Sequence, residues 1–254
     1  MRLILIIISL LIYPLRILIA ALIFTSVHPQ VAVWAILGGV VPSCVWLFFW
    51  IQEDRLHPEP KKIIWRSFGA GIIAVLIAVG LEHLIQPDPT QATLLIFFIF
   101  ALVEEIFKYW AAYFSCINTP YNDEPIDPAI YLISAALGFA ALENIFFLNT
   151  PILQNNLFNS VVTGNLRFLG ANLLHVISSA TIGIFIAFAF YKPPWQRRLY
   201  LIIGLVLAVV LHGLFNFFII KAGGDLFLIF GAVWLCVILL ILVFEKVKTI
   251  KRTS

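Results

Sequence analysis

The sequence predicts an all-α protein, a polytopic bundle of about eight transmembrane helices. Hydrophobic residues make up 62% of the 254 residues and charged residues only 11%, whereas a soluble domain is about 45–50% apolar and about 25% charged. A soluble core does not bury that much apolar surface, so lipid must cover part of it. The apolar residues also form runs of about 20, the length at which a helix crosses the hydrocarbon, whereas a barrel would show short alternating strands.

Eight apolar segments are long enough to cross the bilayer as helices. They cover residues 3–24, 31–51, 66–85, 91–116, 129–149, 166–190, 199–220 and 226–244. Proline-containing loops such as His57–Pro60 and Lys192–Pro194 separate them, and prolines of this kind mark turns. Since no soluble segment interrupts the series, we predict a single integral membrane domain over residues 1–254.

Basic residues gather in alternate loops. They lie mainly within residues 55–66, 192–198 and 246–252, while the loop 117–128 is acidic and holds no Lys or Arg. Cytoplasmic loops carry an excess of Lys and Arg, so with an even number of spans both termini are expected in the cytoplasm. The net charge is only +3. We therefore expect a multi-pass protein of a cell membrane, the bacterial inner membrane, with the lipid bilayer and no nucleic acid as a partner.

The fourth predicted span contains Glu104, Glu105 and Lys108. A charge at mid-bilayer costs about 2.5–3.5 kcal/mol or more, so its default interpretation is functional. Lys108 follows Glu104 by one helical turn and Glu105 by slightly less, which places the three on a common face. Paired carboxylates in a low dielectric suit general acid–base chemistry. A buried structural ion pair is the alternative.

The next three spans carry further polar residues. These are Glu143 and Asn144 in the fifth span, His175 in the sixth, and His212 and Asn216 in the seventh. Successive spans run in opposite directions, and the rise of about 1.5 Å per residue puts Glu104, His175 and His212 at similar depths. A lone histidine in a span is often a packing residue. Two on separate helices, with carboxylates on two more, favour one shared site.

Two mechanisms are compatible with this set of residues. Two neutral imidazoles and a carboxylate form a competent catalytic zinc site, for which His175, His212 and Glu104 are the candidate ligands and Zn²⁺ the candidate cofactor. In a metal-free version, a glutamate and a histidine activate water directly, and either Glu104 or Glu105 could be the base. In both versions Asn216 could donate a hydrogen bond to an oxyanion.

Three more polar residues lie near span ends. Glu82 and His83 stand at the end of the third predicted span, where we expect an interfacial, solvated pair rather than a part of the site. Arg167 opens the sixth predicted span and could lie near the mouth of the site.

The ordered motifs resemble those of the PrsW family of intramembrane proteases. They are Glu104-Glu105-x-x-Lys108, Phe139-x-x-x-Glu143-Asn144, His175 and His212-x-x-x-Asn216, preceded by the acidic, proline-containing loop Glu53–Pro60. The resemblance covers roughly residues 50–220 as a protease core. PrsW proteins are similar to the CAAX prenyl protease superfamily, which shows Glu-Glu-x-x-x-Arg and Phe-x-x-x-His. Lys108 and Glu143 depart from those two motifs and favour the PrsW branch.

The resemblance implies an intramembrane endopeptidase, classed as a metalloprotease, that cuts a membrane-protein or peptide substrate. The best-known role in the family is the first cut of a membrane-bound anti-sigma factor. The expected catalytic residues are Glu104, Glu105, His175, His212, Glu143 and Asn216, with Lys108 and Asn144 in support. Intramembrane Glu and His also form proton relays, so a proton-coupled transporter is the alternative from another class, and a non-catalytic scaffold is a third.

Overall fold

The computed structural model of the protein describes residues 26–55, 57–85, 93–154, 156–220 and 226–251. Within these ranges the chain is helical and contains no strand, which confirms the all-α prediction. The first predicted span, residues 3–24, lies outside the described residues. Each of the other seven predicted spans falls on a helical segment.

The described helices are α2 (Pro29–Ile51), α3 (Lys61–Ile85), α4 (Leu94–Ala112), α5 (Asp127–Leu153), α6 (Leu157–Leu166), α7 (Asn172–Phe188), α8 (Pro194–Ile220) and α9 (Leu226–Val247). A π-helical turn, Arg167–Ala171, joins α6 to α7, so the two form one continuous segment. Among the described residues, six segments are long and apolar enough to cross a membrane. Helix α4 has 19 residues, and its charged residues set it apart from those six.

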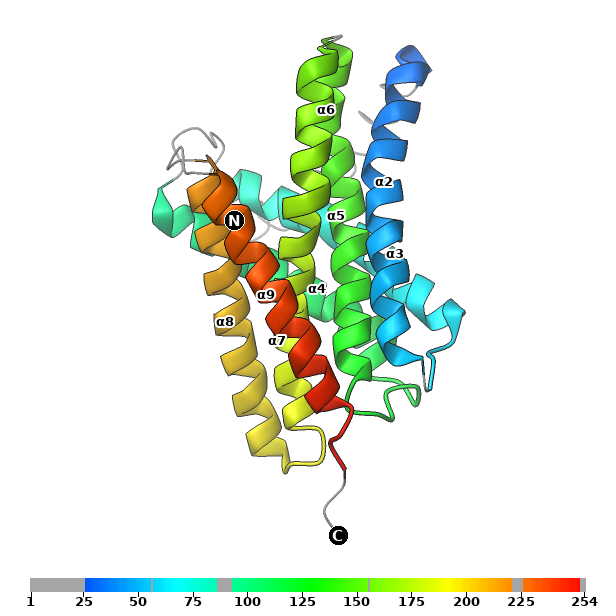
Figure 1. Ribbon diagram of the computed structural model, residues 1–254, viewed down its shortest axis with the longest axis vertical. Helices are drawn as coiled ribbons and strands as arrows, with labels where there is room; N and C mark the ends of the chain where they lie inside the picture. Colours follow the sequence, from blue (N-terminus) through cyan, green and yellow to red (C-terminus); the bar gives the residue numbers. More distant parts are fainter. Residues whose placement is uncertain (1–25, 56, 86–92, 155, 221–225, 252–254) are drawn as a thin grey trace, which may run out of the picture.

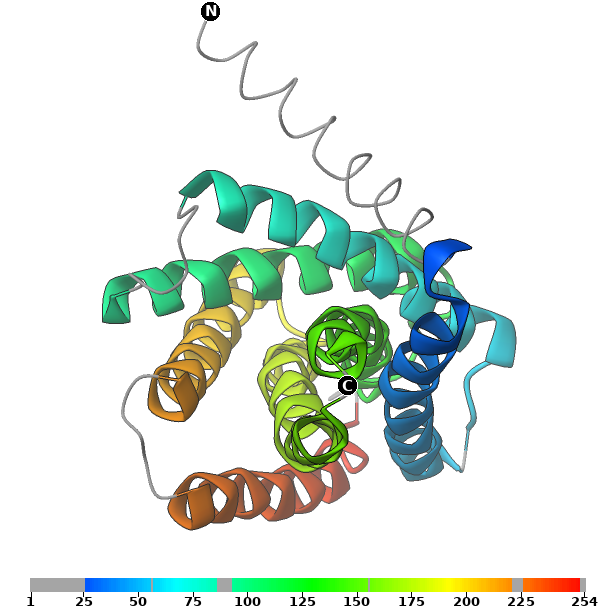
Figure 2. The same ribbon diagram turned by 90° about the horizontal axis from the view of Figure 1, so that it is seen from above.

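Helix α5 lies at the centre of the bundle and packs against α2, α3 and α7 (Figures 1 and 2). Every residue of α5 from Asp127 to Ala141 is buried. Glycines allow the close approach to α3: a Cβ on Gly138 would lie 1.9 Å from the carbonyl oxygen of Phe68, and one on Gly71 would lie 1.9 Å from that of Ala135. Small residues at such crossings let helix backbones meet in a membrane.

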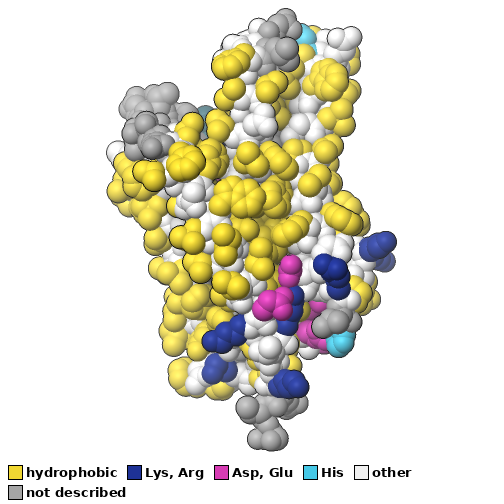
Figure 3. All heavy atoms as spheres, in the orientation of Figure 1, with side chains coloured by type: hydrophobic (Ala, Val, Ile, Leu, Met, Phe, Trp, Pro, Cys, Tyr) yellow, Lys and Arg dark blue, Asp and Glu magenta, His cyan; other side chains and the backbone are white. Residues whose placement is uncertain are grey.

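Helices α3 and α4 run side by side along one flank of α5 and α7, inclined to both (Figure 2). Helix α8 packs against both α4 and α7. This arrangement brings α4, α5, α7 and α8 around one interior region, as the shared-site prediction requires. Figure 3 shows that much of one face is hydrophobic, with its acidic and basic side chains gathered toward the end that carries the C-terminus.

Candidate active site

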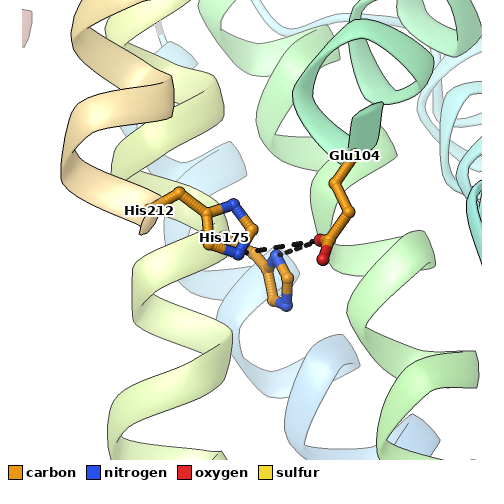
Figure 4. A group of neighbouring side chains, drawn as sticks. All are labelled: Glu104, His175 and His212. Carbon is orange, nitrogen blue, oxygen red and sulfur yellow. Dashed lines mark ion pairs between the residues drawn. The ribbon is translucent and has the colours of Figure 1, made fainter. Parts of the chain in front are cut away.

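Three helices bring Glu104, His175 and His212 together inside the bundle. Figure 4 shows the side chains pointing toward one another from α4, α7 and α8. Glu104 Oε2 lies 3.7 Å from His212 Nε2 and 3.9 Å from His175 Nδ1. The two imidazole rings meet edge to face, with their centroids 5.1 Å apart. All three side chains are buried, so their mutual geometry is fixed by helix packing rather than by solvent.

Lys108 contacts several members of this cluster and is fully buried. Its Nζ donates to Glu104 Oε2 at 3.0 Å and to Glu105 Oε1 at 2.9 Å. It also lies 2.7 Å from His175 Nδ1 and 4.4 Å from the ring centroid of Phe139. One ammonium therefore neutralises part of the charge of two carboxylates, which is the condition under which buried charges are tolerated.

The carboxylate of Glu105 is saturated with hydrogen bonds. Besides Lys108, it accepts from His212 Nδ1 at 2.8 Å, from Ser178 Oγ at 3.0 Å and from Ser179 Oγ at 2.8 Å. These partners come from α4, α7 and α8. Glu105 thus joins three helices and has little capacity left for substrate or water.

Glu104 has a more open environment. Its Oε2 accepts from Lys108, and within the described part of the chain no hydrogen bond engages its Oε1. The side chain is 8% exposed, whereas that of Glu105 is fully buried. Of the two adjacent carboxylates, Glu104 is the one that remains able to take a proton or to bind a ligand.

Carboxylate partners orient both histidines. His212 Nδ1 donates to Glu105 Oε1, and His212 Nε2 faces Glu104 Oε2. His175 Nε2 donates to Glu143 Oε2 at 2.9 Å, while its Nδ1 accepts from Lys108. Both imidazoles are therefore oriented by a carboxylate, the arrangement that metal-binding histidines show when a second group holds the other ring nitrogen.

Glu143 and Asn144 connect the site to the start of α7. Arg167 Nη2 donates to Glu143 Oε2 at 2.6 Å, and Arg167 Nε donates to Asn144 Oδ1. Asn144 Nδ2 in turn donates to Asn172 Oδ1 at 2.9 Å. Arg167 belongs to the π-helical turn, and such turns are frequent at functional sites. The ion pair supports Glu143, so that Glu143 in turn positions His175.

Asn216 lies one helical turn beyond His212 on α8 and is half-buried. In the described ranges it forms no hydrogen bond with the other candidate residues. The structure thus brings together all the predicted polar residues except Asn216, which stands beside the cluster rather than within it.

The prediction that Glu82 is a solvated interfacial residue is wrong. Its Oε1 is buried and has no hydrogen-bond partner among the described residues. Its carboxyl group is near enough to Glu104, Glu143 and Lys108 to feel their charges, so Glu82 belongs to the surroundings of the site. The packing of α3 along α4 and α5 turns this side chain inward. The position of Glu82 within an apolar span could have indicated a buried carboxylate, but its closeness to the end of that span favoured an interfacial position.

The donor set fits a metal ion. One ligand atom each from Glu104, His175 and His212 lies within 4.8 Å of the other two, and two imidazoles with a carboxylate suit catalytic zinc. Glu143 and Glu105 orient the imidazoles from behind. One contact would have to change on metal binding. The Lys108 ammonium lies 2.7 Å from His175 Nδ1 and would have to move away before that nitrogen could bind a metal.

A family comparison now decides among the function classes. The description "PrsW family intramembrane metalloprotease" belongs to the family model that matches residues 59–243. The chain belongs to the PrsW family. It is a multi-pass membrane protein and an intramembrane protease, as the resemblance of its motifs implied.

Bacterial relatives agree with the PrsW assignment. The chain is 30% identical to "Protease PrsW" of Geobacillus kaustophilus over 72% of this chain and 78% of that protein. It is 24% identical to "Protease PrsW" of Bacillus subtilis over 71% of this chain and 80% of the relative. It is 23% identical to "Protease PrsW" of Shouchella clausii over 85% of this chain and 97% of the relative. No solved structure gives a significant match.

Proposed function

We propose that this PrsW-family protease cleaves its substrate with Glu104 as the general base, within a protease core at residues 50–220. The observation that supports this most strongly is the difference between the adjacent carboxylates. Glu105 is saturated with hydrogen bonds, whereas Glu104 Oε1 has no hydrogen-bond partner among the described residues and its Oε2 faces two oriented imidazoles. Glu105 and Lys108 then act as positioning residues.

The reaction follows from the position of Glu104. Its carboxylate takes a proton from a water molecule as the water oxygen attacks the carbonyl carbon of the substrate. The tetrahedral oxyanion is stabilised by a nearby donor, for which Asn216 beside the cluster is the candidate. Collapse breaks the C–N bond, and the proton held by Glu104 passes to the leaving amine. The products are a new carboxyl end and a new amino end.

Zn²⁺ would be held by His175, His212 and Glu104. A zinc ion supplies Lewis-acid polarisation and makes water a better nucleophile at neutral pH. In that version Lys108 would have to withdraw from His175, and Glu82 or Glu143 would be the carboxylate able to accept a proton. The nearness of Glu82 to Glu104 and Glu143 supports this assignment.

The substrate in this proposal is a membrane-associated protein whose span enters the bundle from the lipid. The site lies between helices, and charged side chains gather at one end of the molecule (Figure 3). We place that end, with the basic loops, in the cytoplasm because cytoplasmic segments carry excess Lys and Arg.

Cleavage of a co-expressed single-span reporter tests the role of Glu104. Glu104→Gln is expected to lower the cleavage rate by about 100-fold or more. Glu245→Gln, which removes an exposed carboxylate of α9, is expected to leave it unchanged. Unchanged cleavage in Glu104→Gln at equal expression would rule out Glu104 as the base.

Metal analysis of the purified protein tests the zinc assignment separately. A zinc site at His175, His212 and Glu104 would give about one zinc ion per chain in the unmodified protein, loss of the ion in His212→Ala and inhibition of cleavage by a chelator. A metal-free protein that resists chelators would contradict the zinc assignment and leave the metal-free role of Glu104 standing.

A further inference from the structure

A second group of carboxylates converges at the end of the bundle that carries the loops before α3 and α5. Asp54 ends the helical turn that follows α2, Glu59 lies in the loop before α3, and Asp127 begins α5. One oxygen from each lies within 4.8 Å of the other two. Asp54 and Asp127 are buried. We call these three residues the acidic triad.

The protein satisfies only part of the acidic triad. Asp127 Oδ2 accepts from the backbone N–H groups of Asp123 at 2.9 Å and Glu124 at 2.6 Å. The other oxygen, Asp127 Oδ1, has no hydrogen-bond partner among the described residues. Water cannot replace that partner, because Asp127 is completely inaccessible to solvent. A carboxylate oxygen left in this state is costly, so the position calls for a positively charged or proton-donating ligand.

No basic side chain supplies that ligand within the described ranges. The neighbouring Arg55 donates its Nε to the backbone carbonyl of Gln52, and His57 pairs with Glu124. Neither these residues nor any other described Lys, Arg or His forms an ion pair with the acidic triad. Three ionised carboxylates this close would repel one another strongly in a low dielectric.

We propose that the acidic triad binds one divalent cation of the hard, oxygen-preferring class, such as Mg²⁺ or Ca²⁺. Carboxylate oxygens are the ligands that these ions select, and Asp127 Oδ1 is the unsatisfied ligand atom. Asp54 and Glu59 also line a cavity of about 650 Å³, through which the ion would enter.

The bound ion has a structural effect. The acidic triad joins the end of α2, the proline-containing loop and the first turn of α5, three segments far apart in the sequence. Glu59 also accepts a hydrogen bond from the hydroxyl of Tyr131 on α5. The cation therefore fixes this loop against the central helix. The protease site uses other residues on other helices, so the two sites are chemically separate.

Terbium luminescence tests the proposal directly. Tb³⁺ replaces hard divalent cations, and excitation of Tyr131 would sensitise an ion in the acidic triad because Tyr131 contacts Glu59. The full-length protein in detergent is expected to show saturable luminescence from one ion per chain, which Ca²⁺ or Mg²⁺ displaces. The more effective competitor identifies the preferred ion.

Variants assign the signal to the acidic triad. Asp127→Asn and Asp54→Asn are each expected to weaken Tb³⁺ binding by about 10-fold or more, while His212→Ala and Glu245→Gln retain it. The use of two triad variants guards against misfolding of one. Three outcomes would overturn the proposal. They are absence of saturable luminescence in the unmodified protein, Tb³⁺ binding in both folded triad variants equal to that of the unmodified protein, and loss of Tb³⁺ binding in His212→Ala. The first outcome would indicate that shared protons, rather than a cation, neutralise the acidic triad.

Discussion

Glu104 and Glu105 are neighbours in the chain, yet their carboxylates have different partners. Among the described residues, Glu105 is hydrogen-bonded to groups on α4, α7 and α8, and Glu104 only to Lys108. Successive residues of a helix point about 100° apart, so adjacent side chains meet different neighbours. One carboxylate can therefore hold the bundle together while the other remains reactive.

The two glutamates are expected to differ in stability as well as in activity. Glu105→Gln should lower the free energy of unfolding by about 1.5–3 kcal/mol, because a neutral amide cannot replace the charge-assisted hydrogen bonds. Glu104→Gln should lower it by less, while both variants lose cleavage. Thermal unfolding of the two purified variants in the same detergent measures the difference. A Glu104→Gln variant that is the less stable of the two would contradict the assigned roles.

The sequence predicted much of this site at the level of single residues. Helical spacing placed Glu104 and Lys108 on one face, and the depth of each residue in its span brought in His175 and His212. The contact of Lys108 with His175 was not predictable, because it depends on how α4 and α7 pack. For the same reason the inward direction of Glu82 was missed.

Among the helices, α5 determines how closely the bundle can pack. Its contact with α3 depends on Gly138 and Gly71, since a Cβ at either position would lie 1.9 Å from a backbone carbonyl oxygen of the other helix. Neither carbonyl can move without moving its helix. A shift of α3 would also move Glu82 and the α4 helix beside it, so this crossing affects the geometry of the site.

Gly138→Ala is expected to lower the free energy of unfolding by about 1–3 kcal/mol, the usual cost of overpacking. Gly69→Ala is the matched control in α3, because a Cβ there meets nothing within 4 Å, and the helix should gain about 0.5–1 kcal/mol from it. Thermal unfolding of both variants provides the comparison. Equal effects of the two alanines would show that the crossing is not closely packed.

The end of α9 is connected to the end of α2 by Lys248. Its Nζ donates to Glu53 at 2.8 Å and to Glu245 at 2.6 Å. Partial burial acts to lower the pKa of Lys248, but hydrogen bonds to the two carboxylates outweigh it and raise the pKa. A raised lysine pKa contributes stability that is complete below the unfolded value of about 10.4 and disappears as the pH rises through the folded value.

Lys248→Met should therefore lower the melting temperature slightly at neutral pH. The difference from the unmodified protein should stay constant through the neutral range and shrink above about pH 10.4, where the unfolded lysine loses its proton. Melting curves at several pH values test this. A difference that grows at high pH would have the wrong sign for an ion pair of this kind.

For the whole molecule, composition and run length predicted the helical class, the six described segments that are long and apolar enough to cross a membrane, and helix α4. They could not predict that α5 is central, because a lipid-facing helix and a buried helix are both apolar. The continuous segment from α6 through α7 was also missed in part: its first turns contain Asn156, Asn159 and Asn165, which shortened the predicted span. Which helices lie inside a bundle is decided by small residues and polar contacts between helices.

Peptide hydrolysis in ¹⁸O-labelled water by the purified protein, reconstituted in liposomes with a single-span substrate, tests the central claim most directly. We predict cleavage that places one ¹⁸O atom in the new carboxyl group and that is lost in Glu104→Gln. Substrate-driven proton flux without cleavage, or equal cleavage in Glu104→Gln, would contradict it.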